Sequence, residues 1–489
     1  MSLLNRIASA LVIANALVAF ASAQTQPILS KEVRELVAVE APIVALLHVR
    51  VIDGTGGPPA EDQTVVISGG KIAALGPASS TVVPDGARKM ELSGYTVTPG
   101  MVGMHDHMFY PAPASQARPA GGNMPLYHEL GFSFPRLYLA GGVTTIRTTG
   151  SIEGQTDLEL KKLIDAGKVA GPKMHVTAPY LEGVGSFAAQ MHELTGPEDA
   201  TKAVEFWAGQ GATSFKVYMH ITRAELAAAV KAAHARGLKV TGHLCSIGFR
   251  EAAALGIDDL EHGLLVDNEF VPGKKPDECP DGKERTESLL RLDLSAPPAR
   301  EMIQDLVARR VAVTSTLPVF ETFVPNRPAL PQRVLDALAP ESRSDYLAAR
   351  SRNAQSADNP GAALLKKEMD FERAFVKAGG LLLAGEDPTG YGGVLAGFGD
   401  QRQVELLVEA GFTPVEAIHI ATENGARFLG EESRIGTVAA GKQADLILIH
   451  GDPTKDIADI EKVEIVFKDG IGYDSAKLID SVRGLVGLR

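Results

Sequence analysis

The fold is decided by the stretch Tyr95-Thr96-Val97-Thr98-Pro99-Gly100-Met101-Val102-Gly103-Met104-His105-Asp106-His107. Its apolar run predicts a β-strand that ends at the two histidines. Because alternate side chains of a strand point to one face, we expect His105 and His107 to point the same way. Two imidazoles side by side at a strand end can bind one metal ion. A chain with 12 histidines in 489 residues yields roughly 0.3 such pairs by chance, so other residues must support the site.

The overall composition is that of an acidic globular protein. Hydrophobic residues make up 45% of the 489 residues and charged residues 22%, and the net charge is −12 at pH 7. A chain of this length exceeds one typical domain and suits a barrel enzyme with an accessory module. The negative charge argues against nucleic acids and anionic membranes as partners.

The first 23 residues have the pattern of a signal peptide. Met1–Arg6 carries one positive charge, Ile7–Phe20 is mostly apolar, and Ala21-Ser22-Ala23 offers a small-residue cleavage site before Gln24. The apolar run is too short for a comfortable membrane span, and no later segment reaches about 18 uninterrupted apolar residues. We therefore expect residues 1–23 to be removed, and the mature protein to be free of the membrane and secreted or periplasmic.

The sequence contains two cysteines, Cys245 and Cys279. They allow one disulfide but no disulfide framework. Cys245 lies two residues after His243 and could share the face of that ligand, but we expect it to be a small buried side chain.

Both ends of the chain are dense in short strands. Residues 43–98 contain strand-like runs and glycine-rich turns, and residues 435–470 resemble them. Neither end offers much core of its own. We therefore expect residues 24–98 and 431–489 to pair into one small accessory β-sandwich domain, outside a central domain of residues 99–430.

Between these ends, strand patterns alternate with helical ones. Counting the strand before His105, there are eight strand-like runs, which predicts an α/β protein with a parallel (β/α)₈ barrel. Catalytic groups of such barrels gather at the carboxyl ends of the strands. Six candidate ligands fall at such ends, on strands one, one, four, five, six and eight in turn: His105, His107, Lys216, His243, His262 and Asp387. Several independent candidates at one end of a barrel favour a metal site over structural histidines.

The chain resembles the amidohydrolase superfamily, especially its prolidase-like and imidazolonepropionase-related members, over nearly the whole mature sequence. Pro99–His107 resembles the opening motif, and Gly141–Arg147, Ala421–Ala426 and Gly441–Leu446 resemble three further segments. Together these motifs are specific for the superfamily but not for a substrate. One departure is Glu386, which stands where the family commonly has Thr before the last aspartate, and strand alternation turns its side chain away from the metals.

The resemblance implies a binuclear metal centre. Six residues would divide between a more buried ion, a more exposed ion and a bridge: His105, His107 and Asp387 for the first, His243 and His262 for the second, and Lys216 as a bridging carbamate. An unmodified lysine is a cation and cannot bind a metal, whereas addition of CO₂ makes it an anionic oxygen donor. Zn²⁺ suits this mixed set of imidazole and oxygen ligands, and Mn²⁺, Co²⁺ and Fe²⁺ are the alternatives.

The expected reaction is hydrolysis of an amide bond in a small molecule or short peptide, namely a dipeptide or an N-acyl amino acid. Metal binding can lower the pKa of water from 15.7 to about 7, which supplies a hydroxide to attack the carbonyl. Asp387 would take the proton and pass it to the leaving group. Tyr218 shares the inward face with Lys216 by strand alternation, and it is expected either to donate to the developing oxyanion or to be a core tyrosine.

Several alternatives stay open at this stage. The same metal centre could hydrolyse a cyclic amide, a lactone or a phosphoester, and a non-catalytic metal-binding scaffold is the alternative outside enzymes. Deaminases of the superfamily usually use one metal and lack the bridging lysine, so Lys216 argues against them. Arg147 and His192 could bind a substrate carboxylate or carbonyl, but a structural salt bridge and an exposed side chain are the favoured interpretations. The resemblance also implies a homo-oligomer.

Overall fold

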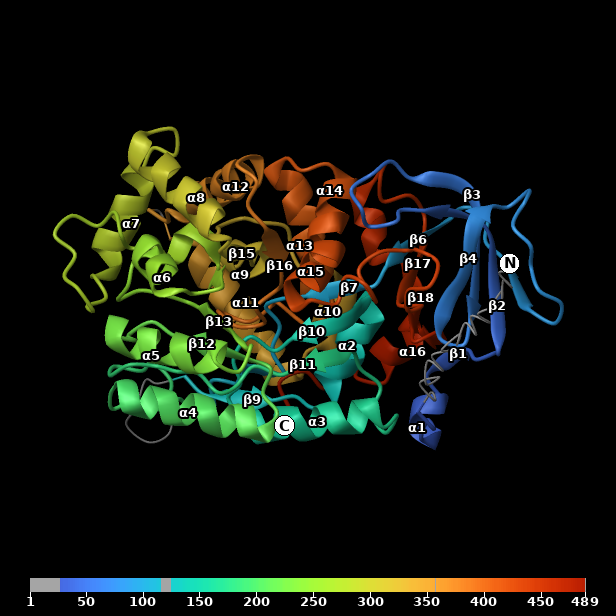
Figure 1. Ribbon diagram of the computed structural model, residues 1–489, viewed down its shortest axis with the longest axis horizontal. Helices are drawn as coiled ribbons and strands as arrows, with labels where there is room; N and C mark the ends of the chain where they lie inside the picture. The colour runs from blue at the N-terminus through green and yellow to red at the C-terminus, as the bar shows by residue number, and fades with distance from the viewer. Residues whose placement is uncertain (1–26, 116–124, 357, 489) are drawn as a thin grey trace, which may run out of the picture.

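The computed structural model describes residues 27–115, 125–356 and 358–488. The signal peptide expected at residues 1–23 lies outside the described residues. Figure 1 shows a large part in which helices surround short strands, and beside it a sheet that contains both blue N-terminal strands and red C-terminal ones.

The larger part contains eight parallel strands in the order expected from the sequence. They form one sheet of three strands and one of five. The three are β7 (Met101–Gly103), β10 (Val143–Arg147) and β11 (Lys173–His175), and the five are β12 (Ser214–Val217), β13 (Lys239–Gly242), β14 (Asp259–Glu261), β15 (Ala312–Ser315) and β16 (Leu382–Ala384). These strands are buried almost throughout, as parallel strands covered on both faces are.

Backbone hydrogen bonds join the two sheets at both edges. Met104 N donates to Ala384 O at 2.8 Å, which joins the ends of β7 and β16. Ala178 N donates to Ser214 O at 3.0 Å, which joins the segment after β11 to β12. The carboxyl ends of all eight strands therefore lie at the same end of the larger part.

Helices connect the strands and cover their outer side (Figure 1). The connecting helices are α2 (Ser133–Gly141), α3 (Gly154–Asp165), α4 (Pro197–Gln210), α5 (Arg223–His234), α6 (Phe249–Leu255), α8 (Pro297–Arg309), α12 (Gly361–Lys377) and α13 (Phe398–Ala410). The sequence of α5 shows why it forms here: Thr222 and Glu225 make a reciprocal capping box, and Leu226, Ala229, Val230 and Ala233 bury one face at helical spacing. No helix of the described residues combines the length and apolarity needed to cross a membrane.

The remaining elements lie between these helices or beside the sheet. They are α1 (Lys31–Arg34), the hairpin of β8 (Phe109–Pro111) and β9 (Tyr127–Glu129), the 3₁₀ helix η1 (Gly263–Val266), α7 (Gly282–Arg291), α9 (Leu317–Glu321), α10 (Gln332–Ala337), α11 (Pro340–Ala354), α14 (Pro414–His419), the π-helix η2 (Ile420–Asn424), α15 (Gly425–Leu429), the 3₁₀ helix η3 (Ile457–Glu461) and α16 (Ser475–Asp480).

The two ends of the chain build one hydrogen-bonded sheet of nine strands. They are β1 (Val37–Val39), β2 (Ile43–Val51), β3 (Ala60–Ser68), β4 (Lys71–Pro77), β5 (Arg88–Glu91), β6 (Tyr95–Pro99), β17 (Leu446–His450), β18 (Val463–Lys468) and β19 (Ile471–Asp474). The two ends meet where β6 and β17 pair antiparallel, with Leu448 opposite Val97 in a core separate from that of the eight parallel strands. The pairing of the ends is thus as expected, whereas the sandwich form and the predicted domain boundaries stay predictions.

Cys245 and Cys279 form the one disulfide that the sequence allows. Cys245 is fully buried, as expected, and the bond joins it to a residue 34 positions further along the chain. The two cysteines meet because the excursion between η1 and α7 folds back over the segment that follows β13. The segment just after His243 is therefore tied covalently to this excursion.

Candidate metal centre

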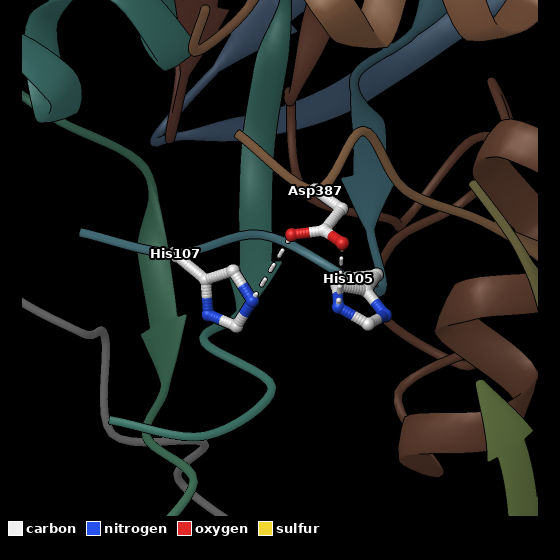
Figure 2. Close-up of side chains that lie close together, drawn as sticks. All are labelled: His105, His107 and Asp387. Carbon is white, nitrogen blue, oxygen red and sulfur yellow. Dashed lines mark ion pairs between the residues drawn. The ribbon is translucent and has the colours of Figure 1, made fainter. Parts of the chain in front are cut away.

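Three of the predicted ligands form one compact group (Figure 2). The nearest ligand atoms of His105, His107 and Asp387 all lie within 4.8 Å of one another. Asp387 Oδ1 is 3.6 Å from His107 Nε2, and Asp387 Oδ2 is 3.8 Å from His105 Nε2. These distances are too long for hydrogen bonds. Atoms that bind one zinc ion at 2.0–2.2 Å stand roughly 3–4 Å apart, so the spacing fits an ion held between the three side chains.

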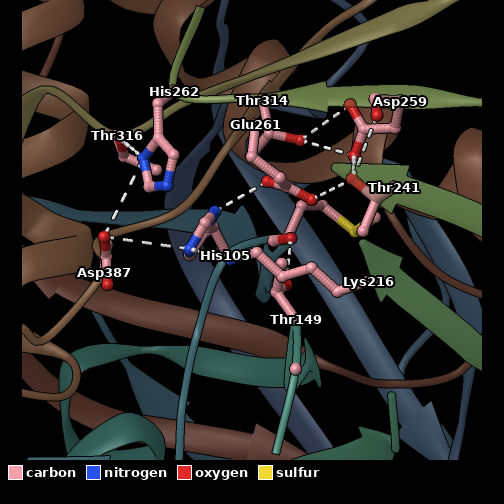
Figure 3. Close-up of polar contacts among 12 residues, drawn as sticks. His105, Thr149, Lys216, Thr241, Asp259, Glu261, His262, Thr314, Thr316 and Asp387 are labelled. Carbon is pink, nitrogen blue, oxygen red and sulfur yellow. Dashed lines mark hydrogen bonds and ion pairs between the residues drawn. The ribbon is translucent and has the colours of Figure 1, made fainter. Parts of the chain in front are cut away.

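The other three predicted ligands lie against this group. Lys216 Nζ is 3.2 Å from His105 Nε2, and the His262 ring centroid is 4.4 Å from that of His105. The His243 ring centroid is 4.7 Å from that of His262. Figure 3 shows Lys216, His105, His262 and Asp387 converging from different strands. The structure therefore brings together all six residues that the sequence placed at the carboxyl ends of the strands.

Two of these residues adopt a backbone conformation that side chains rarely tolerate. His262 has φ 68° and Asp387 has φ 53°, both in the left-handed region. Because neighbours on a regular strand face opposite sides, the turn at His262 lets both Glu261 and His262 reach His105. Such strain persists where the surroundings enforce it, and it is concentrated at functional sites.

The side chains present fit a divalent metal ion. His243 Nδ1 is buried and has no hydrogen-bond partner within the described residues. Buried polar atoms are almost always partnered, so a free nitrogen on an imidazole that packs against His262 marks a ligand position. Neutral imidazoles and carboxylates are the donors that zinc and its neighbours in the first transition row accept.

Hydrogen bonds fix the orientation of the first two histidines. His105 Nδ1 lies 2.6 Å from Glu261 Oε2. His107 Nδ1 lies 3.0 Å from the carbonyl oxygen of Thr148 and 3.1 Å from that of Gly150. Since these partners are acceptors, Nδ1 carries the proton in both rings and Nε2 is left as the ligand atom. This is the usual support of metal-binding histidines.

Threonine hydroxyls hold two further ligands. Thr316 Oγ1 is 2.8 Å from His262 Nδ1, and Thr389 Oγ1 donates to Asp387 Oδ1 at 2.9 Å. The second oxygen of Asp387 faces His105 and His262, at 3.8 Å from a nitrogen of each. One carboxylate oxygen is thus oriented by a hydroxyl while the other points among the histidines.

Burial sets the protonation of the site. It lowers the pKa of the four histidines, to about 3 for His243 and well below the usual range for the other three: His105, His107 and His262. Burial also lowers the pKa of Lys216 to about 8 and raises the pKa of Asp387 to about 6. At pH 7 the histidines are therefore neutral, as metal ligands must be.

Arg147 belongs to a buried ion-pair network beneath the ligands. Its Nη2 lies 2.7 Å from Asp259 Oδ2 and 2.7 Å from Glu261 Oε1, and all three side chains are buried. Arg147 is therefore a structural partner of the carboxylate that holds His105. His192 is exposed and lies 3.3 Å from Asp199. In both cases the interpretation favoured from the sequence is confirmed.

Tyr218 lies beside the predicted ligand His243 in a group of aromatic rings. Its ring centroid is 4.8 Å from that of His243, 4.9 Å from Tyr180 and 5.6 Å from Phe187. Burial raises the pKa of Tyr218 well above its usual range, so its hydroxyl keeps its proton. Sequence reasoning placed Tyr218 correctly but missed Tyr180 and Phe187, because they lie beyond β11 in a segment without a regular period.

Glu386 is directed away from the ligand group. The carboxylate of Glu386 packs so closely against Gly399 that a side chain at position 399 would collide with it. Burial, followed by repulsion from Asp400 and Asp106, raises the pKa of Glu386 well above its usual range. A neutral carboxyl on the far side of Asp387 supports the expectation that Glu386 is not a ligand.

Glu261 is the supporting residue that the sequence analysis missed, although a signal was present. Asp259 and Glu261 lie two positions apart on a buried strand and so share a face. Two carboxylates on one buried face need a cation or hydrogen bonds, because an unpaired buried charge is costly. Arg147 supplies that cation (Figure 3 shows the surrounding hydroxyls of Thr241 and Thr314).

Comparison with known proteins gives one family match. Residues 377–471 match the model of the amidohydrolase family. None of the curated proteins compared matches the chain. The match covers Asp387 and the return of the chain to the nine-stranded sheet.

Solved structures share the fold over most of the chain. A Xaa-Pro dipeptidase with bound methionine in its active site has a TM-score of 0.65 and 21% identity, over 88% of this chain and all of its own (100%). A prolidase complexed with N-methylphosphonate-L-proline has a TM-score of 0.62 and 19% identity, over 88% of this chain and 99% of its own. A bottromycin amidohydrolase has a TM-score of 0.66 and 22% identity, over 94% of this chain and 95% of its own. At these identities the likeness establishes the fold.

Proposed function

We propose that this chain, a hydrolase of the amidohydrolase superfamily that acts on amide C–N bonds, cleaves a dipeptide or an N-acyl amino acid with two divalent metal ions. The observation that carries the proposal is the convergence of four neutral histidines, Asp387 and Lys216 at one end of the strands. A scaffold without catalysis would not require a strained acid–base carboxylate among its ligands.

The substrate class is supported by what two proteins of the same fold hold. The Xaa-Pro dipeptidase was solved with methionine in its active site, and the prolidase with a phosphonate derivative of proline. Both ligands contain an amino acid. We therefore infer that this chain acts on an amide to which an amino acid contributes one side of the bond.

Bound at this site, divalent ions would polarise the substrate carbonyl and supply a nucleophile from water near neutral pH. His105, His107 and Asp387 would hold one ion, and His243 and His262 the other. Lys216 would join them. With a pKa near 8, a useful fraction of its amine is neutral at pH 7 and can form an N–C bond to CO₂, losing a proton to give an anionic carbamate.

Asp387 moves the proton in the proposed reaction. With a pKa near 6 it is a carboxylate at pH 7, yet it is close enough to neutrality to give the proton back. The hydroxyl of Thr389 holds one of its oxygens. Tyr218 keeps its phenolic proton and stands beside His243, so we assign to it the hydrogen bond to the carbonyl oxygen as negative charge develops there.

The architecture and location belong to the same proposal. We infer that the eight strands close into one (β/α)₈ barrel over residues 99–430, with an accessory β-sandwich from residues 24–98 and 431–489. The disulfide between Cys245 and Cys279 supports export, because disulfides persist in oxidising compartments. The homo-oligomer stays a prediction, which light scattering on the purified protein checks.

The deciding experiment is metal analysis of Lys216→Ala together with a substrate panel. The unmodified protein should bind two metal ions per chain, reconstitute faster with added bicarbonate, and hydrolyse dipeptides or N-acyl amino acids. Lys216→Ala should bind about one ion or fewer and lose most activity, because two dications without a bridging anion repel each other. Small carboxylates that restore activity would supply the missing bridge.

Lys89→Ala, which removes an exposed lysine on the accessory sheet, is the matched control and should keep both ions. Two tightly bound ions and full turnover in Lys216→Ala would exclude the carbamate. Hydrolysis of cyclic amides, lactones or phosphoesters in preference to linear amides would replace the proposed substrate class.

A further inference from the structure

A cavity of about 810 Å³ lies at the opposite end of the strands from the metal ligands. Four of its lining residues open or directly precede consecutive strands: Lys239 opens β13, Asp258 precedes β14, Val311 precedes β15 and Leu381 precedes β16. The same strands run toward His243, His262 and Asp387 at their carboxyl ends. The cavity is thus separated from the metal site by the length of the strands.

Three cations line this cavity without an ion pair. Lys239, Arg310 and Arg427 are exposed, and no hydrogen bond or salt bridge of their side chains is found within the described residues. The chain carries 60 acidic against 48 basic residues, so cations have ample carboxylates to pair with. Arg402, for comparison, pairs with Glu321 at 2.7 Å. Three cations without a charged partner in one cavity are therefore unexpected in a chain with an excess of acidic residues.

The carboxylates of the cavity are engaged elsewhere. Asp258 Oδ2 accepts a hydrogen bond from Val240 N at 2.8 Å and lies 2.9 Å from His234 Nε2. Glu416 accepts from the backbone and hydroxyl of Thr413, where it completes a helix cap. Neither carboxylate lies within ion-pair distance of the three cations, so their charge is available to a bound anion.

An aromatic ring lies next to these cations. Lys239 Nζ is 4.3 Å from the centroid of Phe428, and Phe412 and Ile420 add further apolar lining. Thr55, from the loop that follows β2, closes the cavity from the side of the nine-stranded sheet. The cavity therefore offers positive charge next to apolar surface, between the two parts of the molecule.

We propose that this cavity binds a small organic anion, whose phosphate or carboxylate group is held by Lys239, Arg310 and Arg427 and whose apolar part packs on Phe428. The volume falls within the roughly 300–1,000 Å³ of small-molecule sites. Guanidinium groups suit both anions, because they donate two parallel hydrogen bonds to two oxygens. This site is independent of the proposed amide hydrolysis.

The test is calorimetric titration of the metal-loaded protein with phenyl phosphate. Benzoate tests whether a carboxylate binds in place of the phosphate, and inorganic phosphate tests how much the ring contributes to binding. Benzyl alcohol is the neutral comparison ligand. The triple variant Lys239→Met, Arg310→Gln, Arg427→Gln should bind the tighter of phenyl phosphate and benzoate at least about 10-fold more weakly, since it removes the lysine and both arginines of the cavity. The triple variant Lys89→Met, Arg300→Gln, Arg352→Gln, which neutralises exposed cations outside the cavity, should bind like the unmodified protein.

Phosphate can also bind at metal ions, so the binding event that counts is the one lost in the cavity variant and kept in the control. A titration unchanged by the cavity substitutions would overturn the proposal, as would the absence of saturable binding by all three anions. Equal affinity for benzyl alcohol would show that the cavity does not select for charge. The same metal content in both triple variants as in the unmodified protein confirms that the comparison is made on intact metal sites.

Discussion

The charged side chains beneath the predicted metal site have charged partners, whereas the cations at the amino ends of the central strands have none among the described residues. Beneath the predicted metal ligands, along β14, Arg147, Asp259 and Glu261 are buried and bound to one another, and Glu261, at the carboxyl end of the strand, in turn holds His105. At the amino ends, Lys239 and Arg310 are exposed and have no charged partner among the described residues. A buried charge must be partnered within the fold, whereas an exposed one is solvated by water until a ligand replaces it. One end is therefore organised before any ligand arrives, and the other is not.

The backbone shows the same difference. His262 and Asp387 adopt left-handed conformations at the carboxyl end, and neither ends a helix. Arg310, at the amino end, also has positive φ (60°), but it is the C-cap of α8, where this conformation is ordinary. Of these three residues, therefore, only His262 and Asp387, two of the predicted metal ligands, have positive φ without ending a helix. The substitutions below should accordingly have large effects at the carboxyl end and small ones at the amino end.

The largest effect is expected for Arg147→Met. The substitution keeps an unbranched apolar side chain but removes the guanidinium, which leaves Asp259 and Glu261 buried without their cation. Breaking a buried pair in this way typically lowers the free energy of unfolding by about 3–5 kcal/mol. Urea denaturation measures it, with Arg352→Met, at an exposed site, expected within about 0.5 kcal/mol of the unmodified protein. An equal loss of unfolding free energy in both variants would mean that the buried ion pairs of Arg147 contribute no more to stability than an exposed arginine does.

Next in size is Asp387→Asn, which should reduce turnover at least about 100-fold while the fold is kept. A positioned acid–base group contributes at least that much, and the amide has nearly the same shape as the carboxylate. Steady-state kinetics on the metal-loaded variant measure the loss. Near-normal turnover with full metal content would remove Asp387 from the mechanism.

Stability of the metal-free protein provides a control for that variant. Burial raises the pKa of Asp387 from 3.8 to about 6, so the folded state holds a proton that the unfolded state has lost between these values. Stability from this group therefore falls as the pH rises through that window and stays reduced at pH 7. Asp387→Asn removes the penalty, and the metal-free variant should unfold at a higher temperature than the metal-free parent at pH 7. A lower melting temperature would indicate damage to the fold instead.

Glu261→Gln should weaken metal binding about 10–100-fold, the usual effect of removing a residue that orients a ligand. The glutamine can still accept from His105 Nδ1, but without the negative charge that raises the basicity of the ring. Competition with a chelator measures the affinity without reference to activity. Asp370→Asn removes an exposed carboxylate that also pairs with a cation, Lys366, and should leave the affinity unchanged.

The candidate residues at the carboxyl ends of the strands could be predicted from the sequence, because their positions depend on the local alternation of side chains along a strand. Alternation placed His105 and His107 on one face, and the rhythm of strands and helices brought His243 and His262 to the same end. Lys216 and Tyr218 followed from the same rule. Each of these inferences needs only neighbours in sequence and the direction of a strand.

What the sequence could not give are the contacts between distant residues. The bond between Glu261 and His105 joins positions 156 residues apart, and the disulfide requires the excursion before α7 to fold back. The cations of the cavity come from β13, the end of α8 and α15, and only the packing of these three elements brings them together. The left-handed conformations of His262 and Asp387 could not be predicted either, because no local sequence pattern favours positive φ at these residues.

The smallest effect is expected from neutralising the cavity cations together in Lys239→Met, Arg310→Gln, Arg427→Gln. Each is exposed and none is paired within the described structure, so the free energy of unfolding should change by no more than about 0.5 kcal/mol per site, in either direction. Relief of repulsion between like charges offsets the loss of the contact between Lys239 and Phe428. Urea denaturation in parallel with Arg147→Met makes the comparison direct. A loss in the triple variant as large as that of Arg147→Met would show that these cations stabilise the fold, and Phe428 would be the connection, since Lys239 Nζ lies 4.3 Å and the Arg147 guanidinium 5.3 Å from its ring centroid.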